Sequence, residues 1–361
     1  MASADQHAGA RVASGEDLIA EVQYRKMRRI KVIYLPTPSN MAPCWDRDVL
    51  NALGDWHEVH VYDSESPTTG QFAGRDVVIE HGAVSTPSMM EAAKDVKLWQ
   101  VHGTGVDHLD LEGFADRGQA VANCPGECSA AALAECAMMF MLMLARSYQK
   151  SRHDFRRNFT RELVGMELTR RTLLILGLGT SGQQLARRAA SFGLRIMAVD
   201  VQSFDQSLLD ELGVTELATP EELDRLLPDA DFVSLHLHLN SETHHIMSAR
   251  RLGLMKPTAC LINVARGPLV DEAALHQRLI DGKLGGAGLD VFESEPPNAD
   301  LPAYRLANVF TTPHLAGTTD LVSQCRSVFC AKNVDRIAMG LPPHSVVNDP
   351  SAATSLLKRN E

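Results

Sequence analysis

Three glycines near the middle of the chain, Gly177, Gly179 and Gly182, constrain its fold more than any other feature. They follow the short apolar run LLIL and precede the helical run QQLARRAASFG, so a strand, a tight turn and a helix are predicted in succession. In a dinucleotide-binding βαβ unit the first glycine permits the turn, the second lets the backbone approach a pyrophosphate, and the third allows close helix–strand packing. The N–H groups at the helix start, around Thr180 and Ser181, would face the phosphates.

An acidic residue ends the next predicted strand. Asp200 follows LRIMAV and stands 18 residues beyond Gly182. A carboxylate there accepts hydrogen bonds from both ribose hydroxyls of NAD and repels the 2′-phosphate of NADP, and the residues after it, Val201 to Ser203, offer no arginine for that phosphate. The pattern predicts NAD rather than NADP. The alternative is a glycine-rich turn in another kind of α/β protein.

Short apolar runs separated by helical or polar stretches recur along the chain. Each has the length of a strand and many are rich in β-branched residues, which is typical of a parallel α/β sheet. The runs are RIKVIYLP from residue 29, HEVHVYD from 57, DVVIEHG from 76, KLWQVHG from 97, QAVANCP from 119, RTLLILGLG from 171, LRIMAVD from 194, DFVSLHL from 231, ACLINVA from 259, GAGLDVF from 286 and NVFTTP from 308. We therefore predict two α/β units in series, and a C-terminal helix over TDLVSQCRSVFCAKNVDRIAMG that returns to the first unit.

Composition limits the partners. The formal charge of −10, from 45 acidic and 35 basic residues, argues against sequence-independent binding of nucleic acid or of an anionic membrane. The apolar segment 130–145 contains Glu135 and is shorter than a membrane span requires, so we interpret it as a buried or subunit-interface helix. Seven cysteines without a C-x-x-C pair, and an N-terminus without a signal-peptide pattern, predict reduced thiols in a cytoplasmic protein.

Polar side chains follow three predicted strands of the second unit, where α/β sheets bind their ligands. Arg266 could hold a carboxylate through two parallel hydrogen bonds, or it could pair locally with Asp271. Asp290 ends the next strand and Glu295 follows it, while His314 follows the last strand. A lone histidine there is often structural, but a carboxylate on a neighbouring strand end can orient the imidazole and stabilise its charged form.

Five motifs in this order resemble the D-isomer-specific 2-hydroxyacid dehydrogenase family, which includes D-glycerate/hydroxypyruvate reductases and D-3-phosphoglycerate dehydrogenases. They are HGTGVDHLDL, the loop at 177–182, LMKPTACLINVARGPLVDEAAL, GAGLDVFESEP and TPHLAGTT, and the resemblance runs from about residue 30 to 350. It implies an α/β fold of two doubly wound parallel-sheet domains, a Rossmann NAD-binding domain inserted into a split flavodoxin-like substrate domain with the site in the cleft. The expected division is a polar extension at 1–28, the substrate domain at 29–126 and 318–350, the NAD domain at 127–317 and a tail at 351–361.

The resemblance also implies the roles of individual residues. Arg266, Glu295 and His314 would be catalytic: His314 gives its proton to the substrate carbonyl oxygen, Glu295 holds the imidazole, and Arg266 binds the substrate carboxylate together with the backbone of Gly103, Thr104 and Gly105. The implied cofactor-binding residues are Gly177, Gly179, Thr180, Ser181, Gly182, Asp200, His236, Val264, Ala265, Asp290 and His314. The implied partners are a small 2-oxo or 2-hydroxy acid and a second copy of the chain, joined in a homodimer through the helix region 129–147. No metal is predicted, because His236 and His238 lack a third ligand at suitable spacing.

Some residues depart from the family pattern, and other functions remain open. Val101 and His102 stand where members that bind phosphorylated substrates often carry arginine, and no regulatory domain follows residue 350, so we expect a substrate of hydroxypyruvate or glyoxylate type without serine feedback. Ala134-Glu135-Cys136 stands where the family frequently has Ala-Glu-His, so Cys136 replaces the histidine, with unknown effect. The alternatives are an NAD-sensing corepressor or scaffold, and a related enzyme acting on formate or phosphite. Formate enzymes carry glutamine at the position of Glu295, so a glutamate there favours proton transfer.

Overall fold

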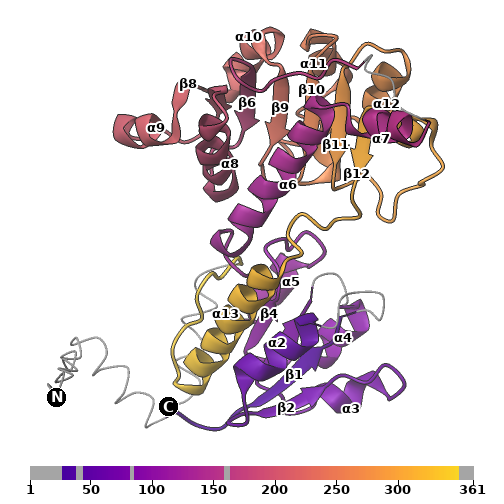
Figure 1. Cartoon of the computed structure of the whole chain (residues 1–361). Helices are drawn as coiled ribbons and strands as arrows, with labels where there is room; N and C mark the ends of the chain where they lie inside the picture. Colours follow the sequence, from indigo (N-terminus) through magenta and orange to yellow (C-terminus); the bar gives the residue numbers. More distant parts are fainter. Residues whose placement is uncertain (1–26, 38–43, 82–84, 158–162, 349–361) are drawn as a thin grey trace, which may run out of the picture. The chain divides into compact units, whose positions relative to one another are not determined.

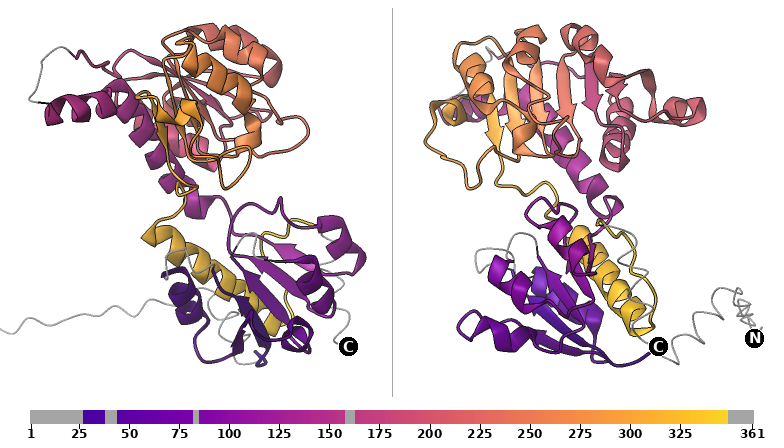
Figure 2. Two further views of the ribbon diagram at one scale, coloured as in Figure 1. Left: turned by 90° about the vertical axis from the view of Figure 1, so that its right-hand side faces the viewer. Right: turned by 180° about the vertical axis from the view of Figure 1, so that it is seen from behind.

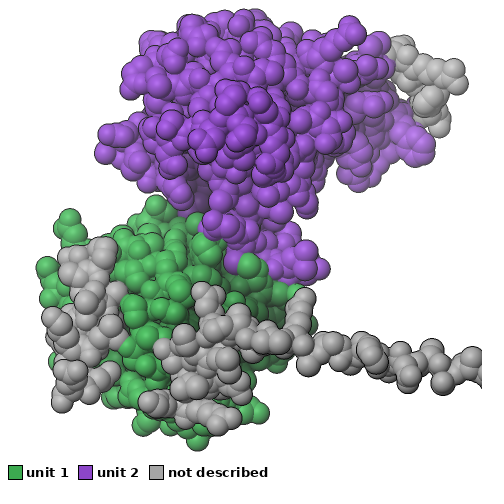
Figure 3. All heavy atoms as spheres, turned by 90° about the vertical axis from the view of Figure 1, so that its left-hand side faces the viewer, with its two compact units in different colours: residues 1–125, 323–361 green, residues 126–322 purple. Residues whose placement is uncertain are grey.

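The computed structural model describes residues 27–37, 44–81, 85–157 and 163–348. The chain divides into two compact units, which Figure 3 shows in different colours: unit 1 comprises Met1–Pro125 and Ser323–Glu361, and unit 2 comprises Gly126–Val322. The expected tail 351–361, and all but the last two residues of the expected extension 1–28, lie outside the described residues.

Unit 1 is built on a five-stranded parallel sheet with the strand order β2-β1-β3-β4-β5 (Figure 1). Its strands are β1 (Lys31–Leu35), β2 (Glu58–Val61), β3 (Val77–Glu80), β4 (Leu98–Val101) and β5 (Ala120–Ala122). This is the flavodoxin-like order, in which ligands bind beyond the carboxyl ends of the strands where the order reverses.

Helices cover both faces of this sheet. They are α2 (Cys44–Leu53), α3 (Thr68–Phe72), α4 (Pro87–Ala92), α5 (Leu111–Asp116) and α13 (Asp320–Ala338). One face packs against α2 and α13, with Cys330 and Val334 of α13 buried beside Val32 and Ile79. The other face packs against α3, α4 and α5. The predicted C-terminal helix is therefore present and completes the core of unit 1.

Unit 2 is built on a seven-stranded parallel sheet with the order β12-β11-β10-β9-β6-β7-β8. Its strands are β6 (Thr172–Leu176), β7 (Arg195–Val199), β8 (Val214–Ala218), β9 (Phe232–Leu235), β10 (Cys260–Asn263), β11 (Gly286–Leu289) and β12 (Val309–Thr311). The order reverses between β6 and β9, so the ligand crevice of a doubly wound sheet is expected beyond the carboxyl ends of these two strands. The predicted fold class of two doubly wound parallel sheets is confirmed.

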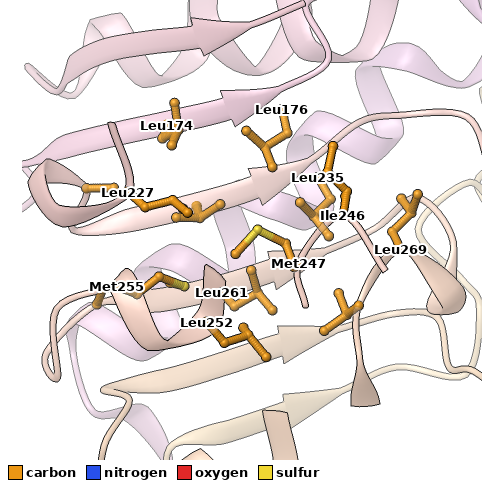
Figure 4. Close-up of a cluster of buried hydrophobic side chains, with 14 of the residues drawn as sticks. Leu174, Leu176, Leu227, Leu235, Ile246, Met247, Leu252, Met255, Leu261 and Leu269 are labelled. Carbon is orange, nitrogen blue, oxygen red and sulfur yellow. The ribbon is translucent and has the colours of Figure 1, made fainter. Parts of the chain in front are cut away.

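Two hydrophobic cores lie on the two faces of this sheet, and Figure 2 shows helices on both sides of it. The helices are α6 (Glu127–Ala145), α7 (Tyr148–Arg156), α8 (Thr180–Ser191), α9 (Gln206–Leu212), α10 (Leu223–Leu226), α11 (Ala249–Leu254) and α12 (Glu272–Ile280), with the 3₁₀ turns η1 (Pro220–Glu222), η2 (Leu227–Asp229), η3 (Gly267–Leu269) and η4 (Pro302–Arg305). Figure 4 shows the core on the α10–α12 face, where Leu174, Leu235 and Leu261 from neighbouring strands meet Met247 and Leu252.

Helix α6 explains the apolar segment of the sequence. By length and composition alone it could cross a membrane, but half of its most apolar window is buried inside the structure. It packs against α8 and against β10, β11 and β12 of the same unit. Met139 on this helix is 40% exposed, so α6 also presents an apolar surface outside the core.

Two expectations need correction. Strand β8 had no counterpart among the predicted runs, because this edge strand is only partly buried and carries the polar residues Thr215 and Glu216. The expectation of reduced thiols throughout is wrong for Cys128 and Cys325, which are disulfide-bonded. The other five cysteines carry free thiols.

Candidate active site

The glycine loop has the geometry that its sequence predicted. Gly177 has a φ of 94°, and a Cβ on it would come within 2.6 Å of the carbonyl oxygen of His236 on the neighbouring strand end. A Cβ on Gly182 would lie 2.0 Å from the carbonyl oxygen of Gly177. Both positions therefore exclude a side chain, because backbone atoms occupy the space that it would need.

The start of α8 fits a dinucleotide phosphate. Gly179 is the N-cap of the helix and no side chain caps its first turn. A Cβ on Gly179 would meet nothing within 4 Å, so the loop leaves open space beside the helix N-terminus. Unpaired N–H groups and the positive end of the helix dipole attract phosphate oxygens at such a place. Thr180 and Ser181, the other predicted loop residues, form the first turn of this helix.

His236 fixes the loop from the adjacent strand. Its Nδ1 lies 3.0 Å from Ser181 Oγ and its Nε2 lies 3.0 Å from Ser234 Oγ. Burial lowers the pKa of this imidazole to about 4, so it is neutral at physiological pH. In the described part of the chain, no group of three or more His, Cys, Asp or Glu side chains could hold a metal ion. His236 is thus placed to order the phosphate loop.

Asp200 lies at the end of β7 beside the loop. One carboxylate oxygen accepts a hydrogen bond from the N–H of Leu178 at 2.6 Å, and the other accepts one from the N–H of Gln202 at 2.9 Å. Two backbone donors hold the carboxylate in one orientation. A fixed negative charge therefore stands next to the turn that would receive the cofactor.

Glu295 and His314 form a hydrogen-bonded pair. His314 Nδ1 lies 2.8 Å from Glu295 Oε2, and Glu295 Oε1 accepts a hydrogen bond from the N–H of Phe292 at 3.1 Å. Partial burial raises the pKa of the Glu295 carboxyl, but the hydrogen bond and charge of His314, the Phe292 N–H and the charge of Arg266 together hold that pKa below its ordinary value. Both side chains stay accessible, with 37% of Glu295 and 50% of His314 exposed. The pair can therefore carry a proton where a ligand can reach it.

Arg266 follows β10 in a turn braced by a residue that the sequence did not single out. Asn263 at the strand end donates to the carbonyl oxygen of Arg266 at 2.8 Å and accepts from the N–H of Ala265 at 3.1 Å. Val264 and Ala265 are buried inside this turn. Since the charge of Arg266 lowers the pKa of Glu295, the structure brings the three predicted catalytic side chains into one electrostatic group. An amide that ends a buried strand was the sequence signal for Asn263.

Asp290 is 1% exposed and binds the turn that carries His314. Its carboxylate accepts hydrogen bonds from the Thr312 hydroxyl, from the N–H of Leu315 at 2.7 Å and from the N–H of Ala316 at 2.8 Å. Its carbonyl oxygen accepts the N–H of His314, a residue with a left-handed φ of 56°. Asp290 therefore shapes the turn that carries His314, a role that the sequence pattern did not predict.

Gly103, Thr104 and Gly105 follow β4 in unit 1. The carbonyl oxygen of Gly103 accepts the N–H of Cys124 at 2.8 Å, and that of Thr104 accepts the Asn123 amide at 2.7 Å. These bonds anchor the loop through its carbonyl groups at the carboxyl edge of the sheet.

A doubly wound parallel sheet with open space at the helix start of its glycine loop, a fixed carboxylate beside that loop and a Glu–His pair beyond its strand ends is typical of a dinucleotide-binding α/β oxidoreductase. Comparison with known proteins gives the family. Residues 138–316 match the NAD-binding domain of the D-isomer specific 2-hydroxyacid dehydrogenases. The chain is 35% identical to the hydroxypyruvate reductase of Thermotoga maritima over 249 residues, which cover 68% of this chain and 78% of that protein. The chain belongs to the D-isomer specific 2-hydroxyacid dehydrogenase family.

Two further relatives show the range of the family. The chain is 35% identical to the D-3-phosphoglycerate dehydrogenase of Methanocaldococcus jannaschii over 76% of its own length, but the match spans only about half of that protein, 52%. Its fold is similar, with a TM-score of 0.74 and 27% identity, to the NADPH-dependent glyoxylate/hydroxypyruvate reductase of Sinorhizobium meliloti in complex with NADP and malonate, covering 88% of this chain and 96% of that one. The family thus uses NAD or NADP, and the chain carries an NAD(P)-binding domain.

Proposed function

We propose that the protein is an NADH-dependent reductase of small 2-oxo acids, of hydroxypyruvate or glyoxylate type, that forms D-2-hydroxy acids. The observation that carries the proposal is the Glu295–His314 hydrogen bond of 2.8 Å, with the charge of Arg266 acting on the same carboxylate. Carbonyl reduction needs a proton donor beside the carbonyl oxygen and a cation for the substrate carboxylate, and this group supplies both.

The bound nicotinamide would supply the hydride. Because Nδ1 of His314 is engaged by Glu295, Nε2 is the nitrogen that gives its proton to the carbonyl oxygen. Glu295 orients the ring and stabilises the imidazolium that precedes this transfer. Arg266 would hold the substrate carboxylate in a forked pair of hydrogen bonds. The segment 103–105 of unit 1 stays a predicted substrate-binding loop.

Asp200 supports NADH over NADPH. Its carboxylate is fixed by two backbone N–H groups beside the glycine loop, so a 2′-phosphate placed there would meet a negative charge that cannot turn away. No arginine stands among the three residues that follow. The preference can be measured as the ratio of kcat/KM for the two cofactors.

Steady-state kinetics test the proposal. Oxidation of NADH and of NADPH is followed with glyoxylate, hydroxypyruvate, pyruvate, phenylpyruvate and 3-phosphohydroxypyruvate, with His314→Ala as the control. We expect turnover with NADH on glyoxylate or hydroxypyruvate, and a loss of about 10²- to 10⁴-fold in His314→Ala with NADH binding retained. Tight NADH binding without turnover on any oxo acid would refute a reductase and favour an NAD-sensing protein, which a search for NADH-dependent partners would then examine.

We further propose that a second copy of the chain covers the exposed side of α6, where Met139 is 40% exposed on a largely apolar helix. Light scattering would give twice the chain mass of 39.4 kDa for a dimer, and Met139→Lys should lower that mass toward the monomer. The cytoplasmic location stays a prediction. The part of it that rested on reduced cysteines is supported by the five free thiols and not by Cys128 and Cys325.

A further inference from the structure

Two catalytic segments of unit 2 meet at a single peptide group, between Phe292 and Glu293. Gly267, the residue after Arg266, lies so close to it that a Cβ there would come within 1.8 Å of the Phe292 carbonyl oxygen and 2.5 Å of the Glu293 nitrogen. On the other segment, the N–H of Phe292 donates to Glu295. Phe292 therefore links the two segments, because its carbonyl group limits where the turn of Arg266 can lie and its N–H holds the Glu295 carboxylate.

The side chain of Glu272 holds this peptide group. Glu272, the first residue of α12, accepts the N–H of Glu293 through Oε2 at 2.8 Å. Its Oε1 accepts the hydroxyl of Tyr304 at 3.0 Å. Glu272 does not cap its own helix, because Asp271 performs that function by accepting the N–H of Ala274.

The surroundings keep Glu272 in this arrangement. The ring of Tyr304 packs edge-on against Phe292 at 5.5 Å and against His276 at 4.8 Å between ring centroids. Burial, followed by the charge of Glu272, raises the pKa of the Tyr304 hydroxyl, which therefore remains a donor. Burial lowers the pKa of His276, whose Nε2 lies 3.9 Å from Glu272 Oε1. Glu293, on the other side, faces His245 at 3.3 Å.

We infer that Glu272 is a positioning residue for the Glu295–His314 pair. It fixes the Phe292–Glu293 peptide against Gly267, and the N–H of Phe292 in turn fixes the carboxylate that holds the imidazole. Glu272 reaches neither substrate nor cofactor in this role. The inference rests on the proposed function for its kinetic readout, but its contacts also predict a change that can be measured without turnover.

Removal and conservative replacement of the carboxylate distinguish positioning from simple stabilisation. Glu272→Ala should lower kcat by roughly tenfold or more, since displacement of a reacting group by a fraction of an ångström has effects of this order. The NADH affinity should stay unchanged. Glu272→Gln should recover most of kcat, because its amide oxygen can accept the Glu293 N–H while its NH₂ donates to Tyr304. Tyr304→Phe, which removes the second anchor, should give an intermediate loss.

A titration supplies the second readout. ¹³C NMR of the glutamate carboxyl groups, with Glu295→Gln for assignment, gives the pKa of Glu295 in each variant. We expect the lowered pKa of wild-type Glu295 to rise toward its ordinary value in Glu272→Ala and to be restored in Glu272→Gln. Gln277→Ala is the matched control on the same helix, because among the described residues its exposed side chain bonds to Asp281, the C-cap residue that follows α12. It should leave kcat and the Glu295 pKa unchanged.

The outcomes separate the two proposals. Wild-type kcat and an unmoved Glu295 pKa in Glu272→Ala would overturn the inference and leave the carboxylate a stabilising residue. If Glu272→Ala does not fold, Tyr304→Phe decides the matter, because wild-type kcat and an unmoved Glu295 pKa in that variant would also overturn the inference. If the wild-type protein reduces no oxo acid, the proposed function fails, and the Glu295 titration still confirms or refutes the role of Glu272.

Discussion

A methyl group at Gly267 should separate the two segments that carry the proposed catalytic residues Arg266 and Glu295. In Gly267→Ala the new Cβ would lie 1.8 Å from the carbonyl oxygen and 1.9 Å from the carbonyl carbon of Phe292. Ordinary van der Waals contact begins at 3.4 Å, so the segments must move apart by about 1.6 Å. The obstructing atoms belong to the backbone, and no side-chain rotation can relieve the overlap.

The magnitude follows from what this displacement disturbs. Forcing one methyl group into packed atoms costs about 1–3 kcal/mol of folding free energy, and a clash with backbone places Gly267→Ala at the upper end. Catalysis should suffer more than stability, because Arg266 precedes Gly267 and Phe292 holds Glu295. A misplacement of about 1 Å at a reacting group costs on the order of 10²-fold in rate. We therefore expect kcat to fall by about 10²-fold and NADH affinity to stay near the wild-type value.

Urea unfolding and steady-state kinetics measure the two effects. Gly253→Ala in α11 is the matched control, since a Cβ at Gly253 would meet nothing within 4 Å. That variant should gain about 0.5–1 kcal/mol, because alanine restricts the unfolded chain, and should keep wild-type kcat. If Gly267→Ala turned over like Gly253→Ala, the segments would not need their close approach, and the reasoning would be refuted.

Three further predictions concern the cofactor, acid stability and the His314 turn. Asp200→Ala should raise the ratio of kcat/KM for NADPH to that for NADH by about ten- to a hundredfold, because it removes charge-assisted hydrogen bonds to the ribose of NADH. Parallel steady-state kinetics with both cofactors measure this ratio. Burial lowers the pKa of His81 and of His236 to about 4, so below pH ~6.5 the unfolded chain binds more protons than the folded one. The free energy of unfolding should therefore fall as the pH drops from about 6.5 to about 4, by about 3 kcal/mol for each histidine. Urea unfolding across this range should show smaller losses in His81→Asn and in His236→Asn. Asp290→Asn should cost about 1.5–3 kcal/mol through lost charge-assisted hydrogen bonds and should lower kcat by displacing the turn that carries His314; stability unchanged in urea would contradict this.

The sequence predicted the parts of the fold that depend on local pattern. Buried parallel strands are continuous apolar runs, and eleven such runs correspond to strands of the structure. Strand β8 was missed because its pattern of exposure is mixed: Thr215 is exposed, while Val214 and Ala218 are buried. An edge strand has a partner on one side only, so its sequence need not be apolar throughout.

The glycine loop was predictable for the same reason, because its requirements are local. Gly182 must be small because Gly177, five residues earlier, places a carbonyl oxygen 2.0 Å from the missing Cβ. The corresponding requirement at Gly267 comes from Phe292, which is distant in the chain, and neither spacing nor periodicity encodes that approach. Side chains that bind backbone across such distances, as Glu272 binds Glu293, likewise appear in the sequence only as polar residues near strand or helix ends.

The three side chains proposed to be catalytic share one structural principle. Arg266 stands on a turn braced by Asn263, Glu295 on a turn held through Glu272, and His314 on a turn bound by Asp290. In each case a buried or half-buried polar side chain accepts backbone N–H groups or donates to a backbone carbonyl, so the position of the catalytic group is set by main-chain geometry. Every one of these bonds lies inside unit 2. Electrostatic stabilisation of a transition state requires donors that are already oriented, and this unit supplies that orientation from its own strands. We therefore expect substitutions in the Gly103–Gly105 loop of unit 1 to act on the KM of the oxo acid. Substitutions of Asn263, Glu272 or Asp290 should instead act on kcat.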